Sequence, residues 1–211
     1  MRTLYFFILI FFVACSSAPE LINLDQSKAL VQDYYESGRF VAEMVKIVND
    51  AIDQISSQEL NENSTVVLDI DETVLSNYNH TKEIGFGFRI DIWNEWLKQG
   101  NAQVVPQMKR FYDYLISRNI KIVFLTGRYE ETRESTIKNL VAQGFTKFDT
   151  LITRSHSEER LPAAKFKEEK RIKLIENGYE IIMCVGDQMS DLNGKHTGYK
   201  VKLPNYLYKL D

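Results

Sequence analysis

Residues 65–77 read TVVLDIDETVLSN, and this stretch decides the fold. Residues 65–68 are apolar or β-branched, as in a strand that is buried on both faces of a parallel sheet. Asp69 and Asp71 follow at the carboxyl end of that strand, where open α/β sheets bind their ligands. An acidic pair after a strand also occurs in ordinary solvated turns, so the pair alone does not establish a functional site.

Further strands alternate with helices along the chain. Short apolar runs predict strands at 121–125, 150–153, 181–185 and 199–203. Helical patterns lie between them, at 91–98, from Pro106 onward, at 130–143 and in a charged segment that ends near 176. This alternation predicts an α/β fold in which helices flank a parallel sheet.

The N-terminal segment 26–57 has a helical pattern of its own. Apolar residues recur at steps of four and three, at Val41, Val45, Val48, Ile52 and Ile55. We expect this face to pack against the sheet. Gly38 predicts a break between two helices.

The length and composition limit the kind of protein. At 211 residues the chain has room for one α/β domain with added segments. The net charge of −3 and the lack of a long basic run exclude a general binder of nucleic acid polymers, whose affinity depends on neutralising phosphates. No feature of the sequence predicts an oligomeric state.

Residues 1–15 differ from the rest of the chain. Arg2 precedes an apolar run at 4–13, which has the length of a signal-peptide core and is too short to span a membrane. The tetrapeptide Phe-Val-Ala-Cys at 12–15 resembles the lipobox of bacterial lipoproteins, in which the cysteine receives the lipid. We therefore expect a lipoprotein signal peptide at 1–15 and lipidation at Cys15.

An ordinary signal peptide cut near Ala14 or Ala18 is the alternative. With a lipid on Cys15, the chain would consist of a tether at 16–25 and a folded domain at 26–211. The protein would then be anchored to a membrane of the bacterial cell envelope, outside the cytoplasm. Ser16 is compatible with sorting to the outer membrane in a Gram-negative organism.

Aromatic residues are dense in 78–104, directly after the acidic pair. Gly85 and Gly87 predict a loop ahead of the short helix at 91–98. We interpret 78–104 as a cap-like insertion, whose aromatic side chains either roof a ligand pocket or form a small satellite core. The candidate substrate-binding residues are Asn77, Tyr78, Phe88, Trp93 and Trp96.

Three predicted strands end in polar residues that neighbouring strands would bring together: Asp69 with Asp71, Thr126, and Asp187 with Asp191. Four carboxylates in one crevice repel one another unless a cation and a basic residue compensate. Oxygen ligands without a nearby His or Cys favour Mg²⁺, and a lysine from the helix after residue 163 would add the other positive charge. Such a cluster suits phosphoryl transfer, which depends on positioning and on neutralising negative charge.

These residues also carry a family resemblance. The segments 69–73 (DIDET), Thr126, Lys167 and 186–191 (GDQMSD) resemble the four successive motifs of the haloacid dehalogenase (HAD) superfamily. The match is closest to its secreted acid phosphatases, namely the bacterial class C lipoprotein enzymes and the plant class B group with the vegetative storage proteins. The resemblance implies a HAD-like Rossmannoid sheet and an Mg²⁺-dependent acid phosphatase for small phosphomonoesters, with 5′-nucleotides among its substrates.

The resemblance also implies a role for each residue. Asp69 would be the nucleophile that forms an aspartyl-phosphate, and Asp71 would act as general acid and then as general base. Thr126 and Lys167 would hold the phosphoryl oxygens. The implied metal ligands are Asp69, Asp71 through its main-chain carbonyl, Asp187 and, directly or through water, Asp191.

Three lysines, Lys165, Lys167 and Lys170, are candidates for the charge-compensating lysine. Phe-Lys-x-x-x-Arg at 166–171 resembles the family's aromatic-Lys-x-x-x-Arg pattern, which favours Lys167. Arg128 is expected to form a structural ion pair.

Two other phosphatase chemistries are excluded by the sequence. No histidine lies in an Arg-His-Gly motif, and the sixth residue after Cys184 is Ser190 where a cysteine phosphatase has arginine. A non-catalytic binding or storage lipoprotein that retains the HAD fold is the alternative function. The presence of all the implied catalytic and metal-binding residues argues against it.

Overall fold

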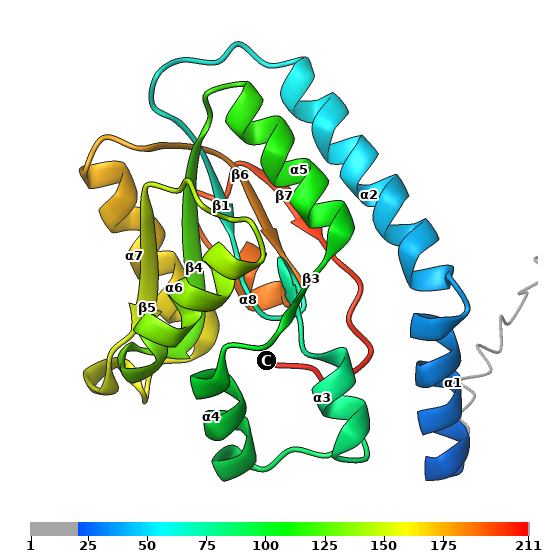
Figure 1. Ribbon diagram of the computed structural model, residues 1–211. Coiled ribbons are helices and arrows are strands. Elements are labelled where there is room, and N and C mark those ends of the chain that lie inside the picture. Colours follow the sequence, from blue (N-terminus) through cyan, green and yellow to red (C-terminus); the bar gives the residue numbers. More distant parts are fainter. Residues whose placement is uncertain (1–20, 211) are drawn as a thin grey trace, which may run out of the picture.

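Five strands form one parallel sheet in the computed structural model, which describes residues 21–210 (Figure 1). In chain order they are β1 (Ser64–Leu68), β4 (Lys121–Tyr129), β5 (Thr150–Arg154), β6 (Glu180–Gly186) and β7 (Tyr199–Lys202). Their order in the sheet is β5-β4-β1-β6-β7, and every neighbouring pair is parallel. The predicted α/β fold is confirmed, with β1 at the centre between β4 and β6.

Helices cover both faces of this sheet. Val66 and Leu68 of β1 join the larger core, to which α2 (Arg39–Ser56), α5 (Pro106–Ser117) and α6 (Arg133–Ala142) also contribute. Val67 joins the smaller core on the other face, under α7 (Ala163–Glu176) and α8 (Met189–Leu192). Successive side chains of a strand point to opposite faces, so β1 is buried on both, as its unbroken apolar run predicted.

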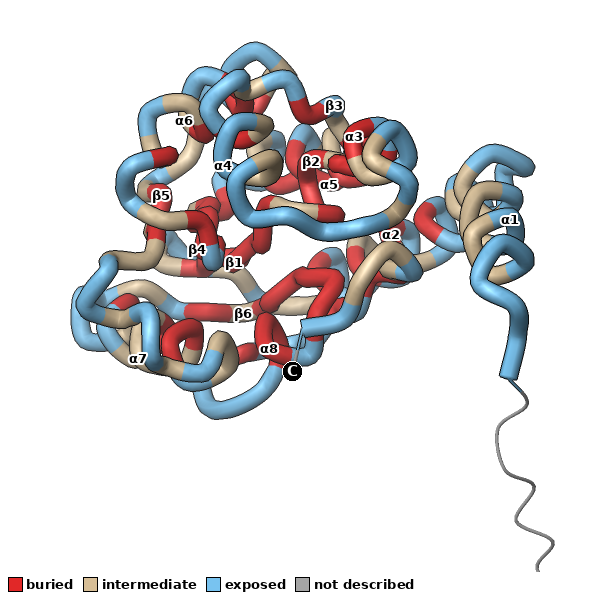
Figure 2. The backbone as a smooth tube through the Cα atoms, turned by 90° about the horizontal axis from the view of Figure 1, so that it is seen from below, coloured by how far each residue is buried: buried red, intermediate tan, exposed pale blue. Residues whose placement is uncertain are grey.

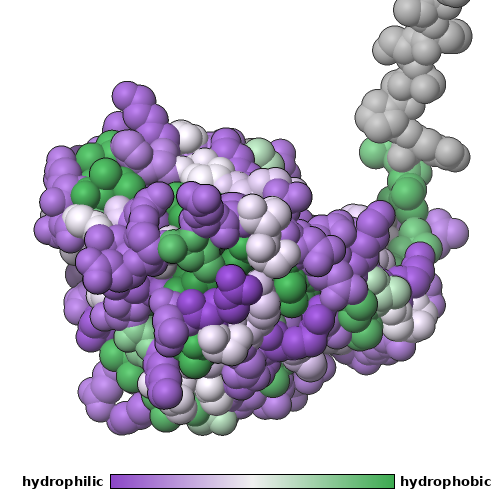
Figure 3. All heavy atoms as spheres, turned by 90° about the horizontal axis from the view of Figure 1, so that it is seen from above, coloured by the Kyte–Doolittle hydropathy of each residue, from purple (hydrophilic) through white to green (hydrophobic). Residues whose placement is uncertain are grey.

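The N-terminal helical pattern forms two helices, as predicted. α1 (Leu24–Glu36) and α2 are separated at Gly38, whose φ of 88° lies in the left-handed region. α1 packs on α2 and stands away from the sheet (Figure 2). It begins inside the predicted tether, at Leu24, and exposed hydrophobic residues gather around its start (Figure 3).

Residues 1–20 lie outside the described part of the chain, and with them the predicted signal peptide and Cys15. Within residues 21–210 no helix is both long enough and apolar enough to cross a membrane.

The prediction of which α2 residues face the sheet was partly wrong. Val41 and Val45 are 47% and 40% exposed, whereas the side chains that face the sheet are Met44, Val48, Ala51 and Ile55. These four residues are spaced by four, three and four, which forms a helical stripe displaced from the valine positions. The start of α2 lies next to α1 rather than over the sheet, and within residues 21–210 the two valines stay exposed.

The insertion at 78–104, called the cap below, lies at the carboxyl end of the sheet (Figures 1 and 2). It contains α3 (Tyr78–Glu83) and α4 (Ile90–Gln99), and the second matches the predicted helix. An antiparallel ribbon of β2 (Leu75–Ser76) and β3 (Gln103–Val104) joins its two ends. This ribbon holds the cap beside the residues that follow β1.

The segment after 125 differs from the prediction. The strand was predicted to end at 125, but β4 continues through Thr126, Gly127 and Arg128 to Tyr129. The pairing of β4 with β5 shifts register between Leu125 and Tyr129, so the end of the strand is irregular. Two short 3₁₀ turns, Glu130–Thr132 and His156–Glu158, complete the loops at this edge.

Gly198 sets the position of the edge strand β7. Its φ is 57°, and a Cβ there would lie 2.2 Å from the carbonyl carbon and oxygen of Ile182 in β6. Because the clash is with backbone, no side-chain rotation relieves it. β7 can therefore pair with β6 only if residue 198 is glycine.

We expect Gly198→Ala to lower the free energy of unfolding by more than about 2 kcal/mol. Gly178→Ala is the matched control, because Gly178 also has a positive φ of 86° but faces open space. The control should lose only about 1 kcal/mol, the cost of the left-handed conformation. Urea unfolding of both variants measures this, and equal losses would show that the contact with Ile182 does not matter.

Candidate active site

Asp69 and Asp71 lie directly beyond β1, at the wall of a cavity of about 550 Å³ at the carboxyl edge of the sheet. The Asp69 N–H donates to the Val185 carbonyl of β6 at 3.0 Å, which extends the strand pairing by one residue. Because β4, β1 and β6 are neighbours, Thr126 and Asp187 come to the same edge. The predicted convergence of three strand ends is therefore present.

Lys167 reaches this edge from α7. Its Nζ donates to Asp69 Oδ1 at 2.7 Å and also to Asp191 Oδ1, and all three residues are buried. Burial alone would lower the pKa of Lys167, but Asp191 and Asp69 together raise it, so the ammonium stays charged. Lys165 is exposed and Lys170 pairs with Glu158, so Lys167 is the lysine of the three that meets the acidic residues.

Asp71 has a different partner. Arg128 Nη2 lies 2.6 Å from Asp71 Oδ1, and Arg128 Nε lies 3.0 Å from Oδ2, in a buried ion pair. Burial would raise the pKa of Asp71, but the charge and hydrogen bonds of Arg128, with a bond from Asn77, lower it below the usual value. The structural ion pair expected for Arg128 is thus formed with one of the two central aspartates.

The carboxylates of Asp69, Asp187 and Asp191 form a cluster, with one oxygen of each lying within 4.8 Å of the others. Gly186 makes this possible, because a Cβ at that position would lie 2.1 Å from Asp191 Oδ2. Gln188 and Asn205 donate to Asp187 Oδ2 at 2.6 and 2.7 Å and hold that side chain in place.

The cluster is short of positive charge. Burial and the neighbouring Asp191 raise the pKa of Asp187 to about 6. Burial also raises the pKa of Asp69 well above its usual value, although Lys167 opposes the shift. One ammonium among three buried carboxylates leaves a net negative charge, so an oxygen-ligated cation fits this donor set.

Thr126 is buried within β4, the neighbour of β1, and its hydroxyl accepts a hydrogen bond from the Arg128 N–H at 3.1 Å. The next residue, Gly127, contributes to the cavity wall.

The five candidate substrate-binding residues divide into two groups. Phe88 and Trp93 line the cavity. Asn77, Tyr78 and Trp96 are not part of its wall: Tyr78 stacks on Tyr35 of α1 with ring centroids 4.6 Å apart, and Trp96 donates to Asn77. The cap aromatics therefore both line a pocket and form a satellite core.

Part of the cavity wall was missed at the sequence level. Leu207, Tyr208 and Leu210 of the C-terminal segment line it, and Tyr208 donates to the buried Glu72. Arg154 from the end of β5 also contributes. No local pattern marks these residues, because their place depends on where β7 and β5 end in the sheet.

The sheet brings two aspartates, a lysine and an acidic cluster that could hold a cation to one cavity, an arrangement that suits phosphoryl transfer. The chain belongs to the HAD superfamily, subfamily IIIB (Acid phosphatase), whose sequence profile matches residues 18–211. It is thus a phosphomonoester hydrolase by family, and the superfamily is typically metal-dependent.

Similar proteins come from plants and bacteria. The chain is 33% identical over 185 residues to the "Stem 31 kDa glycoprotein" of Glycine max, covering 85% of this chain and 73% of the relative. It is 30% identical to "Acid phosphatase 1" of Solanum lycopersicum (84% and 72% covered) and 30% identical to "Vegetative storage protein 1" of Arabidopsis thaliana (89% and 73% covered). The class C acid phosphatase from Bacillus anthracis shares the fold, with a TM-score of 0.72, 22% identity and coverage of 88% and 86%.

Lys167→Met should destabilise the metal-free protein by about 3–5 kcal/mol, because it leaves buried carboxylates without their ammonium partner. Lys165→Met is the control on the same helix, where exposed ion pairs contribute less than about 1 kcal/mol. Urea unfolding in EDTA at neutral pH measures both. Similar losses in the two variants would contradict the assigned role of Lys167 as the counter-charge.

Proposed function

We propose that the protein hydrolyses small phosphomonoesters with Mg²⁺ through a phosphorylated Asp69. The observation that carries this proposal is the Lys167 ammonium 2.7 Å from Asp69 Oδ1, beside the Asp187 and Asp191 carboxylates. A lysine in this position holds the nucleophile and meets the negative charge of an incoming phosphoryl group.

The reaction proceeds in two steps. In the first, an Asp69 carboxylate oxygen attacks the phosphorus, the ester P–O bond breaks, and the leaving alkoxide takes a proton from Asp71. In the second, Asp71 takes a proton from water, the water oxygen attacks the phosphorus, and the bond to Asp69 breaks to release phosphate. Asp71 lies two residues from Asp69 and lines the same cavity, which supports this division of roles.

The resting state of Asp71 is the carboxylate, because Arg128 lowers its pKa. A bound phosphoryl group places further negative charge next to Asp71 and raises that pKa again. Protonation of Asp71 is thus favoured when substrate is present and at acidic pH.

Mg²⁺ would be held by the Asp69 and Asp187 carboxylates and the Asp71 main-chain carbonyl, with Asp191 as a further or water-mediated ligand. An ion bound by these residues would neutralise negative charge on the phosphoryl oxygens. Thr126 would contact the same oxygens.

The substrates include molecules with a flat apolar group, and we propose 5′-nucleotides among them. Phe88 and Trp93 line the same cavity as Asp69, where aromatic side chains can stack on a flat group. A storage role is the second candidate, supported by the similarity to a vegetative storage protein.

Asp69→Asn should lower kcat on p-nitrophenyl phosphate by more than about a thousandfold, because it removes the nucleophile. Mass spectrometry of acid-quenched wild-type protein should detect phosphate on the peptide that contains Asp69. EDTA should abolish activity, and Mg²⁺ should restore it.

Asp113→Asn is the control, since Asp113 is exposed on α5 and pairs with Lys109 away from the cavity; its activity should equal that of wild type. Activity that survives Asp69→Asn would disprove the nucleophile. A wild-type protein that binds Mg²⁺ but turns over no member of a phosphomonoester panel would favour the storage role.

We also propose that a lipid on Cys15 anchors the protein to a membrane of the bacterial cell envelope, in the outer membrane of a Gram-negative organism. The support is the lipobox-like sequence at 12–15 and the apolar run before it. The three sequence relatives named above are plant proteins, and this proposal does not rest on them.

Cys15→Ala should move the protein from the membrane fraction to the soluble fraction and abolish labelling with radioactive palmitate. Cys184→Ala, which changes a buried cysteine of β6, should do neither. A wild-type protein that incorporates no palmitate would favour the ordinary signal peptide cut near Ala14 or Ala18.

A further inference from the structure

We propose that Trp96 and Asn77 are positioning residues that hold the Asp71 carboxylate in the orientation needed for proton transfer. The inference rests on the proposed function, because it assigns to Asp71 the role of general acid. It connects α4 of the cap directly to the reacting group.

Two hydrogen bonds form the connection. Trp96 Nε1 donates to Asn77 Oδ1 at 2.7 Å, and Asn77 Nδ2 donates to Asp71 Oδ1 at 2.9 Å. The Asn77 side chain is completely buried, so no water competes for it. Its main-chain N–H is also fixed, by Glu72 Oε1 at 2.8 Å.

The chemistry of the two ends determines the orientation of the amide. An indole N–H only donates and an ionised carboxylate only accepts, so Asn77 has to present its oxygen to Trp96 and its NH₂ group to Asp71. A reversed Asn77 amide would place its oxygen against the Asp71 carboxylate and would also lose the hydrogen bond from the indole N–H. Removing the indole N–H takes away the second of these two penalties, so the amide orientation is less firmly fixed.

The hydrogen bonds to Asp71 are unequally divided. Oδ1 accepts from Asn77 Nδ2 and from Arg128 Nε and Nη2, whereas Oδ2 accepts, among the described residues, from Arg128 Nε alone. Oδ1 is saturated with donors, so Oδ2 is the oxygen that has room for the transferred proton. Asn77 thereby helps to select which carboxylate oxygen reacts.

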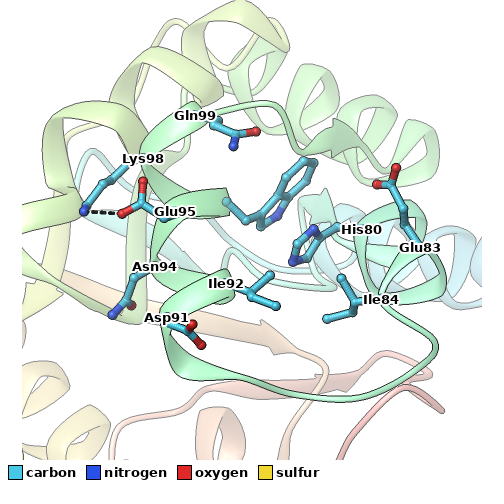
Figure 4. Close-up of a pocket in the computed structure, with 10 residues that line it drawn as sticks. His80, Glu83, Ile84, Asp91, Ile92, Asn94, Glu95, Lys98 and Gln99 are labelled. Atoms are coloured by element: carbon cyan, nitrogen blue, oxygen red, sulfur yellow. Dashed lines mark hydrogen bonds and ion pairs between the residues drawn. The ribbon is translucent and has the colours of Figure 1, made fainter.

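The surroundings of Trp96 fit a residue that holds another side chain in place, and not one that stacks on a substrate. Trp96 borders a cleft of about 570 Å³ in the cap and is not among the residues that line the catalytic cavity, although the two share His80, Ile84, Asn94 and Lys98. The His80 ring lies parallel to the indole at 6°, with centroids 4.6 Å apart. Figure 4 shows His80 of α3 beside Ile84 and Ile92 in this cleft, so the stack is held from both cap helices.

A pair of matched substrates tests the inference. p-Nitrobenzyl phosphate and p-nitrophenyl phosphate have similar shapes, but only the first releases an alkoxide that requires a general acid. Trp96→Phe keeps the aromatic ring and removes the N–H. We expect its kcat/KM to fall at least about tenfold more for p-nitrobenzyl phosphate than for p-nitrophenyl phosphate.

The ratio of the two kcat/KM values does not depend on the fraction of folded enzyme, so a loss of stability cannot imitate this result. Asn77→Leu, which cannot donate to Asp71, should show the same selective loss and serves as a second variant. Trp93→Phe is the control: Trp93 lines the cavity, and its substitution should affect both substrates alike.

Equal losses for the two substrates in Trp96→Phe and Asn77→Leu would overturn the inference. A selective loss in Trp93→Phe would overturn it as well. Failure of the proposed function is distinct, because wild-type protein would then hydrolyse neither substrate.

Discussion

Crowding of negative charge at the end of one buried strand is the constraint on which the rest of the site depends. Asp69, Asp71, Asp187 and Asp191 meet at the carboxyl edge of the sheet, where burial raises the pKa of Asp69 and Asp187. Two buried cations from different elements, Lys167 of α7 and Arg128 of β4, compensate part of this charge. The remaining deficit of positive charge explains why an oxygen-ligated cation fits this set of carboxylates.

The cations also separate the two central aspartates chemically. Lys167 and the acidic cluster surround Asp69, whereas Arg128 and Asn77 hold Asp71. Two identical side chains two residues apart thus have different partners and opposite pKa shifts.

Much of the fold could be predicted, because a buried parallel strand has a simple pattern. The apolar runs that became β1, β4, β5, β6 and β7 are short, bounded by turns and alternate with helical periods. The prediction was wrong where helical periodicity does not reveal which element a side chain packs against. Val41 and Val45 have helical spacing and were expected to face the sheet, but both are exposed. The continuation of β4 to Tyr129 was likewise hidden, since its polar residues resemble a turn.

The sequence by itself determined the fold class, the family and the residues that supply carboxylates, because those residues stand at fixed distances from strand ends and in motif order. Only the tertiary structure decided which side chains share a partner. It placed Trp96 on Asn77 rather than in the cavity, paired Arg128 with Asp71, and brought Leu207, Tyr208 and Leu210 to the cavity wall. These contacts join residues from separate elements, and their geometry follows from how strands, cap and C-terminal segment pack together rather than from any local pattern.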